Sequence, residues 1–352
     1  MINKKILIIT PSLNPKENIS GISSFVNTLI DNYKEETYAP FYVGKKDNEK
    51  RSIKWLISFI IRPFQLFFFI KNEIKLCHYN LGLEPKSIIR DSLLFFIIKI
   101  KRVPIILHLH GGRFMNNESH LFSPLIKYFL KNAKQIIVLG SKEKKWITSK
   151  YKISEDKINI IPNSIKIPSE LNKKINSENL QIIYLGRIDK KKGLQKIIDA
   201  ITILDNKIPL KIHICGIGPD LEWMKHSIPQ KVSNNFIFHG LVVGENKNKI
   251  LKNSDIFLLP SDFEGLPISL LESMGLGVIP IVTPVGSIPE VVNNNNGILI
   301  NNAEDISNAI ELLFKDNNLA NKLSNNAYLQ IKNNFSVSNL KDKIRETYKK
   351  VK

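Results

Sequence analysis

The stretch of residues 255–283 constrains the fold of this chain more than any other feature of its sequence. It contains an apolar run at 256–259, a short polar loop, a helical pattern that begins near Pro267, and a second apolar run at 278–282. Proline is tolerated in the first turn of a helix because it has no N–H group to lose there. This order of strand, loop, helix and strand is typical of a βαβ unit and therefore predicts a parallel sheet.

Two glutamates lie within this stretch, Glu264 in the loop and Glu272 eight residues later on the predicted helix. Ligands of parallel sheets bind at the carboxyl ends of the strands, where helix N-termini also point. Carboxylates accept hydrogen bonds from sugar hydroxyls, so the pair suggests a site for a neutral, hydroxyl-rich part of a ligand. The alternative is that Glu264 caps the helix and Glu272 is a solvated helical residue. The stretch alone leaves both interpretations open.

The same alternation of strand and helix patterns runs through both halves of the chain, which predicts an α/β fold with two domains. A length of 352 residues is ample for two hydrophobic cores. Residues 166–179 are polar, mixed in charge and aperiodic, so we expect a linker there. The predicted parts are an N-terminal domain at 1–165, the linker, a C-terminal domain at 180–335 and a final helical segment at 336–352.

The chain carries a formal net charge of +19 at pH 7, which favours anionic partners such as phosphates, acidic lipid surfaces or nucleic acid. The alternative explanation is compositional, because lysine, isoleucine and asparagine are abundant throughout. The two cysteines, Cys77 and Cys215, lie in apolar runs without metal-binding or disulfide spacing. That pattern is typical of buried thiols in a reducing cytoplasm. The first residues also lack the apolar length and cleavage site of a secretory signal peptide.

The most apolar segment spans residues 55–70 and has basic residues beside and within it. It is shorter than a typical membrane-spanning helix and is broken by Arg62 and Pro63, so we do not expect it to cross a bilayer. One interpretation places it in a membrane interface, with its cations near acidic headgroups. The other makes it a buried crossover helix of the first domain.

Two positions in the first half lie where a predicted strand ends. His110 follows the strand at 103–109 and is itself followed by Gly111 and Gly112, which open the backbone. Its imidazole is therefore a candidate ligand contact in a central cleft, although a lone histidine is also common as a structural residue. Gly21 lies at a strand-to-helix turn, where backbone N–H groups can approach a phosphate. A simple tight turn explains Gly21 equally well.

The loop after the predicted strand at 181–185 carries Arg187 and Lys192. A planar guanidinium fork and a lysine point charge near a helix N-terminus suit a diphosphate group. The alternative is a solvated basic loop. Gly216 and Gly218 follow the next strand, at a turn where the backbone could contact a base or a ribose.

These motifs, taken in order, resemble those of the retaining glycosyltransferases of family 4, also called glycosyl transferases group 1, which have the GT-B fold. In the second half the matching pieces are Gly186-Arg187, Lys192-Gly193, Gly216-x-Gly218-Pro219, His239-Gly240, Asp255, Pro260-Ser261, Glu264 with Glu272, and Gly286 with Pro289-Glu290. The first half matches more loosely, through Gly21, His110-Gly111 and Pro162-Asn163. The resemblance covers nearly the whole chain, and the number and order of the motifs make it specific.

The resemblance implies a role for each charged candidate. Arg187 and Lys192 are expected to hold the donor diphosphate and to neutralise the charge that grows on it as the glycosyl bond breaks. This stabilisation needs neither a metal ion nor another cofactor. Glu264 is expected to bind hydroxyls of the donor sugar, Glu272 the ribose hydroxyls, and His110 the sugar from the other domain.

The resemblance also implies backbone contacts with the donor. Gly265, Leu266 and Pro267 are expected to lie against the sugar and phosphate, while Gly21 lets a first-domain loop approach the phosphates. Two positions depart from the family pattern: Leu266-Pro267 stands where Phe-Gly is common, and Ser20-Gly21 where two glycines are common. Because no carboxylate is placed as a nucleophile, retaining transfer is expected to run by front-face attack, with the leaving phosphate helping to deprotonate the acceptor.

The sequence thus predicts an α/β protein of GT-B type, with two Rossmann-like domains facing a central cleft and the final helix, 336–352, packing back on the first. The expected activity is retaining hexosyl transfer from a nucleotide-sugar, with a UDP-sugar favoured. The expected acceptor is a lipid-linked or lipid-anchored glycan of a bacterial capsule, O-antigen or lipopolysaccharide. The expected location is the cytoplasmic face of the inner membrane, without nucleic acid as a partner. The alternatives are a GT-B epimerase or phosphorylase, and a non-catalytic basic protein that binds membrane or nucleic acid.

Overall fold

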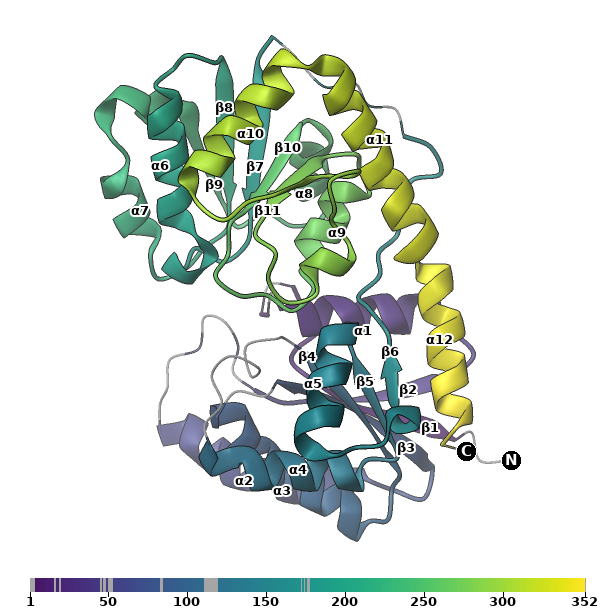
Figure 1. The fold of residues 1–352 in the computed structure, drawn as a ribbon. Coiled ribbons are helices and arrows are strands. Elements are labelled where there is room, and N and C mark those ends of the chain that lie inside the picture. The colour runs from purple at the N-terminus through teal and green to yellow at the C-terminus, as the bar shows by residue number, and fades with distance from the viewer. Residues whose placement is uncertain are drawn as a thin grey trace. The chain divides into compact units, whose positions relative to one another are not determined.

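The computed structural model describes most of the chain. It covers residues 4–15, 17–18, 20–44, 46, 49, 53–82, 85–110, 120–171, 173, 175 and 178–351, with the backbone alone at 53–59, 85–86 and 120. The described chain forms two compact units (Figure 1). The first comprises Met1–Ser164 with Val337–Lys352, and the second comprises Ile165–Ser336.

The described residues of the first unit contain a six-stranded parallel sheet in the order β2-β1-β3-β4-β5-β6. Its strands are β1 (Lys5–Thr10), β2 (Thr37–Tyr42), β3 (Ile74–Gly82), β4 (Ile105–His110), β5 (Gln135–Val138) and β6 (Ile158–Ile160). Its helices are α1 (Gly21–Asn32), α2 (Ile53–Phe69), α3 (Pro85–Ile100), α4 (Ser123–Asn132), α5 (Ser141–Tyr151) and α12 (Val337–Lys349). The chain order reverses between β1 and β3, and parallel sheets of this type bind ligands at such a point.

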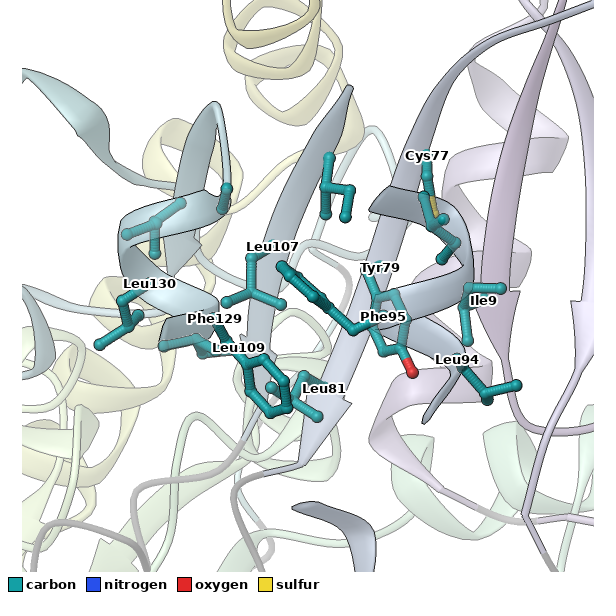
Figure 2. Close-up of a cluster of buried hydrophobic side chains, with 14 of the residues drawn as sticks. Ile9, Cys77, Tyr79, Leu81, Leu94, Phe95, Leu107, Leu109, Phe129 and Leu130 are labelled. Carbon is teal, nitrogen blue, oxygen red and sulfur yellow. The ribbon is translucent and has the colours of Figure 1, made fainter. Parts of the chain in front are cut away.

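Both faces of this sheet are buried, since its strands alternate apolar side chains between two cores. Ile6 and Ile8 belong to the core that α1 and α12 cover. Leu7 and Ile9 belong to the opposite core, to which α2, α3, α4 and α5 contribute. In Figure 2, Phe95 of α3 and Phe129 of α4 lie against strand residues of this second core. The sheet is therefore a rigid support for the loops at its carboxyl edge.

The last helix of the chain, α12, belongs to the first unit and lies beside α1 (Figure 1). Its residues Leu340, Ile344 and Tyr348 are buried in the core shared with Ile6 and Ile8. The N-terminal and C-terminal segments of the chain therefore complete one hydrophobic core together.

The described residues of the predicted linker, 166–179, pack on the second unit instead of connecting two free domains. Tyr328 Oη donates hydrogen bonds to the carbonyl oxygens of Pro168 and Ser169, at 3.0 and 2.7 Å. Ile175 is buried. The second unit therefore begins at Ile165, because these contacts order a segment whose polar composition resembles that of a linker.

The described residues of the second unit contain a parallel sheet in the order β12-β11-β10-β7-β8-β9. Its strands are β7 (Leu180–Leu185), β8 (Leu210–Cys215), β9 (Phe236–Gly240), β10 (Ile256–Leu259), β11 (Ile279–Val282) and β12 (Ile298–Leu299). Its helices are α6 (Leu194–Leu204), α7 (Leu221–Ser227), α8 (Gly244–Lys252), α9 (Ile268–Met274), α10 (Ala303–Lys315) and α11 (Asn317–Asn334). The chain order reverses between β7 and β10, as in dinucleotide-binding sheets, so the loops after these strands flank the preferred ligand position.

Candidate active site

The loops that follow β7 and β10 are in direct contact at the carboxyl edge of the second sheet. Gly193, with φ +76°, ends the first loop, and a Cβ atom there would lie 2.0 Å from the carbonyl oxygen of Pro260. The Asp262 N–H donates to the carbonyl oxygen of Lys191 at 3.0 Å. Only glycine permits this backbone approach at position 193, and the approach brings the side chains of the two loops together.

Lys192 and Glu264 form an ion pair between these loops. Lys192 Nζ lies 2.7 Å from Glu264 Oε1, and Ser261 Oγ donates to the same oxygen at 2.7 Å. The Glu264 side chain is only 10% exposed, and that of Lys192 is 24% exposed. The structure therefore brings together two residues that lie 72 positions apart in the sequence, at the point where the strand order reverses.

Arg187 lies on the same loop as Lys192 and is exposed. Burial and the nearby Glu264 carboxylate raise the pKa of the Tyr184 hydroxyl well above its usual range, and this protonated hydroxyl donates to the Arg187 carbonyl oxygen at 2.5 Å. In the part of the chain that the structure describes, the Arg187 guanidinium has no carboxylate partner. Its backbone is thus anchored while its charge is available to an anion.

The predicted glycines after β8 have a packing function. A Cβ atom on Gly216 would lie 1.8 Å from the Gly186 carbonyl oxygen, and one on Gly218 would lie 2.0 Å from that of Ile188. The loop after β8 therefore packs directly on the loop that carries Arg187. Contact between these glycines and a ligand, which the sequence suggested, stays a prediction.

A loop after β11 packs against Glu264 from the other side. Gly286 has φ +57°, and a Cβ atom there would lie 2.0 Å from the Glu264 carbonyl oxygen. Ser287 N–H donates to the Gly265 carbonyl oxygen at 3.0 Å. The backbone at Glu264 and Gly265 is therefore held by its neighbours, which fixes the position from which the Glu264 side chain extends.

Glu272 lies on α9 and has a partner that the sequence did not reveal. Lys247 Nζ of α8 lies 2.6 Å from Glu272 Oε1, and both side chains are partly exposed. No motif includes Lys247, and only the packing of the two helices shows the pairing. Leu266 is buried, while Pro267 precedes α9 in an extended conformation.

In the first unit, His110 ends β4 and is oriented by Asn80 of β3. Asn80 Nδ2 donates to the Ile9 carbonyl oxygen at 2.9 Å, so its Oδ1 faces His110 Nε2, 2.8 Å away. An amide oxygen only accepts hydrogen bonds, so His110 Nε2 carries the proton and Nδ1 is the acceptor of the ring. Asn80 was not predicted; the pairing of β3 with β4 places it beside His110.

Two further histidines lie behind His110. His78 Nε2 is 3.1 Å from His108 Nδ1, and the rings of His108 and His110 have centroids 4.0 Å apart. His78 Nδ1 is 2.8 Å from Tyr348 Oη of α12. Burial lowers the pKa of His78 and of His110 to about 3, and burial together with the neighbouring histidines lowers the pKa of His108. All three rings are therefore neutral near pH 7.

Gly21 begins α1, after Ser20, whose Oγ accepts from the Ser23 N–H at 3.2 Å. A Cβ atom on Gly21 would meet nothing within 4 Å. Packing within the described chain therefore gives no reason for a glycine here, in contrast to Gly216 and Gly218. Gly111 and Gly112, which follow His110 in the sequence, lie outside the described residues.

The fold and this arrangement of charges define a class: an α/β protein with two Rossmann-like units, and with a cation–carboxylate pair at the strand-order reversal of the second sheet. Residues 169–330 match the family model described as glycosyl transferases group 1, and residues 84–167 match that of glycosyltransferase family 4. An uncharacterised glycosyltransferase of Methanocaldococcus jannaschii is 30% identical over 318 residues, which are 83% of this chain and 79% of that protein. The chain belongs to the group 1, or family 4, glycosyltransferases.

Two further proteins are similar over nearly the full chain. One is the Campylobacter jejuni enzyme named GalNAc-α-(1→4)-GalNAc-α-(1→3)-diNAcBac-PP-undecaprenol α-1,4-N-acetyl-D-galactosaminyltransferase, which is 28% identical with 96% of each chain covered. The other is the crystal structure of Anabaena HepE in complex with UDP-glucose, with a TM-score of 0.77, 16% identity, and 98% of this chain and 99% of that chain covered. The latter similarity confirms the predicted GT-B fold.

Proposed function

We propose that this glycosyltransferase moves a sugar, with retention of configuration, from a UDP-sugar to a lipid-linked or lipid-anchored glycan of a bacterial surface polysaccharide. The observation that carries the proposal is the Lys192–Glu264 pair at the strand-order reversal of the second sheet. The similar Campylobacter jejuni enzyme is named for an undecaprenol-linked acceptor, and HepE was crystallised with UDP-glucose. Such an acceptor places the reaction at a membrane surface, which we take to be the cytoplasmic face of the inner membrane.

The ion pair suggests how the donor is bound. In the structure, Lys192 and Glu264 neutralise each other at 2.7 Å. In the proposal, Lys192 leaves Glu264 and binds the donor diphosphate together with the exposed Arg187. Glu264, still held by Ser261, then accepts hydrogen bonds from sugar hydroxyls. Likewise, Glu272 leaves Lys247 and accepts hydrogen bonds from the ribose hydroxyls. The fold holds these groups in place, which lowers the cost of ordering them on binding.

The chemical step follows from the same charges. The bond between the sugar C1 and the diphosphate oxygen breaks, and the acceptor oxygen bonds to C1 on the same face. The acceptor proton passes to an oxygen of the leaving diphosphate. Arg187 and Lys192 stabilise the negative charge that develops on that diphosphate, so no metal ion or cofactor takes part in the proposed step. Gly265, Leu266 and Pro267 contribute backbone contacts to the sugar and phosphate.

In the proposal, His110 and Gly21 of the first unit also contact the donor. The fixed tautomer of His110 leaves Nδ1 as an acceptor for a sugar hydroxyl. Gly21 offers backbone without a side chain at the start of a helix, where a phosphate is favoured.

A thermal-shift screen with UDP-, GDP- and ADP-sugars tests the donor. A ligand that binds only the folded protein raises its melting temperature, so we expect a UDP-sugar to do so. Lys192→Ala should remove that shift and reduce transfer by about 100-fold or more, because a charge contact to the leaving group is lost. Lys196→Ala is the matched control, since Lys196 of α6 pairs with Asp262, on the loop that carries Glu264.

Two results would contradict the proposal. One is a UDP-sugar shift in Lys192→Ala equal to that of the unmodified protein. The other is conversion of the donor sugar to an epimer when no acceptor is present, which would identify an epimerase on the same fold.

A further inference from the structure

Helix α3 has apolar side chains on two faces. Its inner face, with Ile88, Leu94, Phe95 and Ile98, is buried in the core of the first unit. Its outer face carries a second stripe of apolar side chains that are 48–65% exposed: Ile89, Leu93, Phe96 and Ile100. These positions follow the spacing of one helix face. Soluble proteins rarely leave such a continuous stripe uncovered, so it points to a partner.

Helix α2 extends this exposed surface. Leu66 and Ile70 face the core, whereas Ile60, Ile61, Phe64 and Phe68 are 44–74% exposed. The two helices pack against each other on the same side of the sheet (Figure 1). Lys101, just after α3, places its Nζ 3.7 Å from the centroid of the Phe67 ring of α2. We call the exposed apolar residues of both helices the α2–α3 face: Ile60, Ile61, Phe64, Phe67, Phe68, Ile89, Leu93, Phe96 and Ile100.

The charge around the α2–α3 face is almost entirely positive. The sequences of α2, α3 and the adjacent α4 contain Lys54, Arg62, Lys86, Arg90, Lys99, Lys127 and Lys131, but a single acidic residue, Asp91. Asp91 is buried and accepts from its neighbour Arg90 at 2.7 and 2.9 Å, so it adds no exposed negative charge. A second copy of the chain on this face would bring like charges together. Anionic lipid headgroups, in contrast, complement it.

The α2–α3 face does not belong to a membrane-spanning segment. Among the described residues, none of the helices combines the length and the apolar character needed to cross a bilayer. Aromatic and aliphatic side chains beside arginine and lysine are instead typical of a surface that enters the headgroup region and stops there.

We infer that the α2–α3 face docks on the surface of an anionic lipid bilayer. Phe64, Phe68 and Ile100 enter the boundary between headgroups and acyl chains, while Arg62 and Lys127 contact lipid phosphates. The inference rests on the proposed function only in that a lipid-linked acceptor requires the enzyme at a membrane. It assigns that contact to particular side chains of the first unit.

Flotation of the full chain with lipid vesicles tests the inference. We expect the protein to bind vesicles of phosphatidylglycerol and phosphatidylcholine, to bind pure phosphatidylcholine at least tenfold more weakly, and to dissociate as salt is raised. The combined variant Phe64→Ser, Phe68→Ser, Ile100→Ser should bind the anionic vesicles at least tenfold more weakly. A matched control replaces Ile203 and Leu312 of the second unit, which are 45% and 47% exposed, by serine and should bind as the unmodified protein does.

Equal vesicle binding by the triple variant and the control would overturn the inference. So would a dimer in solution that the triple variant abolishes while the unmodified protein ignores vesicles, because the face would then be a contact between copies. The UDP-sugar thermal shift, measured on the same proteins, tests donor binding separately from membrane binding. We expect that shift to be unchanged in the triple variant, so loss of vesicle binding alone cannot be due to a damaged donor site.

Discussion

At the scale of single residues, the candidate residues of each unit depend on side chains that fix their direction. Ser261 and Lys192 both donate to Oε1 of Glu264, which orients a carboxylate that is nearly buried. Asn80 orients His110 in a similar way, because its Nδ2 donates to the Ile9 carbonyl oxygen and its Oδ1 accepts from His110 Nε2. These supporting residues decide which atom of each functional group can meet a ligand.

Asn80→Ala tests the role assigned to the His110 tautomer. Removing the amide leaves His110 Nε2 without its acceptor, so the imidazole should populate both tautomers. We expect the transfer rate to fall about tenfold. The ¹⁵N chemical shifts of the His110 ring should show the mixed tautomers directly. Retention of the single tautomer in the variant would show that Asn80 does not position this ring.

At the scale of elements, the site is held by loops that pack backbone on backbone. Gly193, Gly216, Gly218 and Gly286 each approach a carbonyl oxygen of another loop so closely that a side chain does not fit. The sequence suggested ligand contacts for two of them, Gly216 and Gly218. Their packing explains equally well why a glycine is present, so these positions do not by themselves indicate a ligand.

Comparison of Gly216→Ala with Gly21→Ala separates the two kinds of glycine. At Gly216 the new methyl group would overlap the Gly186 carbonyl oxygen, so we expect the free energy of unfolding to fall by roughly 2–3 kcal/mol. At Gly21 nothing lies within 4 Å, so stability should change by about 1 kcal/mol or less. Urea denaturation measures both. The UDP-sugar shift should weaken in Gly21→Ala, and an unchanged shift would remove Gly21 from the proposed site.

At the scale of the whole molecule, the chain returns at its end to the unit in which it began. Tyr348 of α12 contacts His78 of β3 across 270 residues of sequence, inside the core that α1 also covers. The second unit is therefore an insertion between the two segments of the first. The stability of the first unit accordingly depends on both ends of the chain.

The buried histidines predict how this stability changes with pH. The pKa of His78 is lowered from 6.5 to about 3 in the folded chain. Between these pH values the unfolded chain binds a proton at this histidine and the folded chain does not. The stabilisation is fully present above pH 6.5 and is lost as the pH falls towards 3, by roughly 1 kcal/mol per histidine for each pH unit. The protection of first-unit amides against hydrogen exchange, expressed relative to the intrinsic exchange rate at each pH, should therefore fall on acidification. His78→Gln should weaken this dependence, and the same change at exposed His226 should not.

The sequence by itself determined the class of fold and supplied candidates for the charged centre of the proposed site. Apolar runs that alternate with helical patterns can be buried in few ways other than a parallel sheet, and residues after a strand must lie at its carboxyl edge. For this reason Lys192, Glu264 and His110 could be named as candidates from local pattern, and the motif resemblance gave them their expected roles. Asn80, Lys247 and Tyr348 could not, because their partners are set by strand order and helix packing.

Only the tertiary structure decided what the ambiguous segments do. Residues 166–179 have a linker-like composition, yet the described residues among them pack on the second unit, with contacts to α11 that local sequence does not encode. The apolar positions of α3 surround the helix, so periodicity cannot tell a fully buried helix from one with an uncovered face. Whether a residue is buried depends on what packs against it, whereas the sequence gives only the tendency of that residue type to be buried.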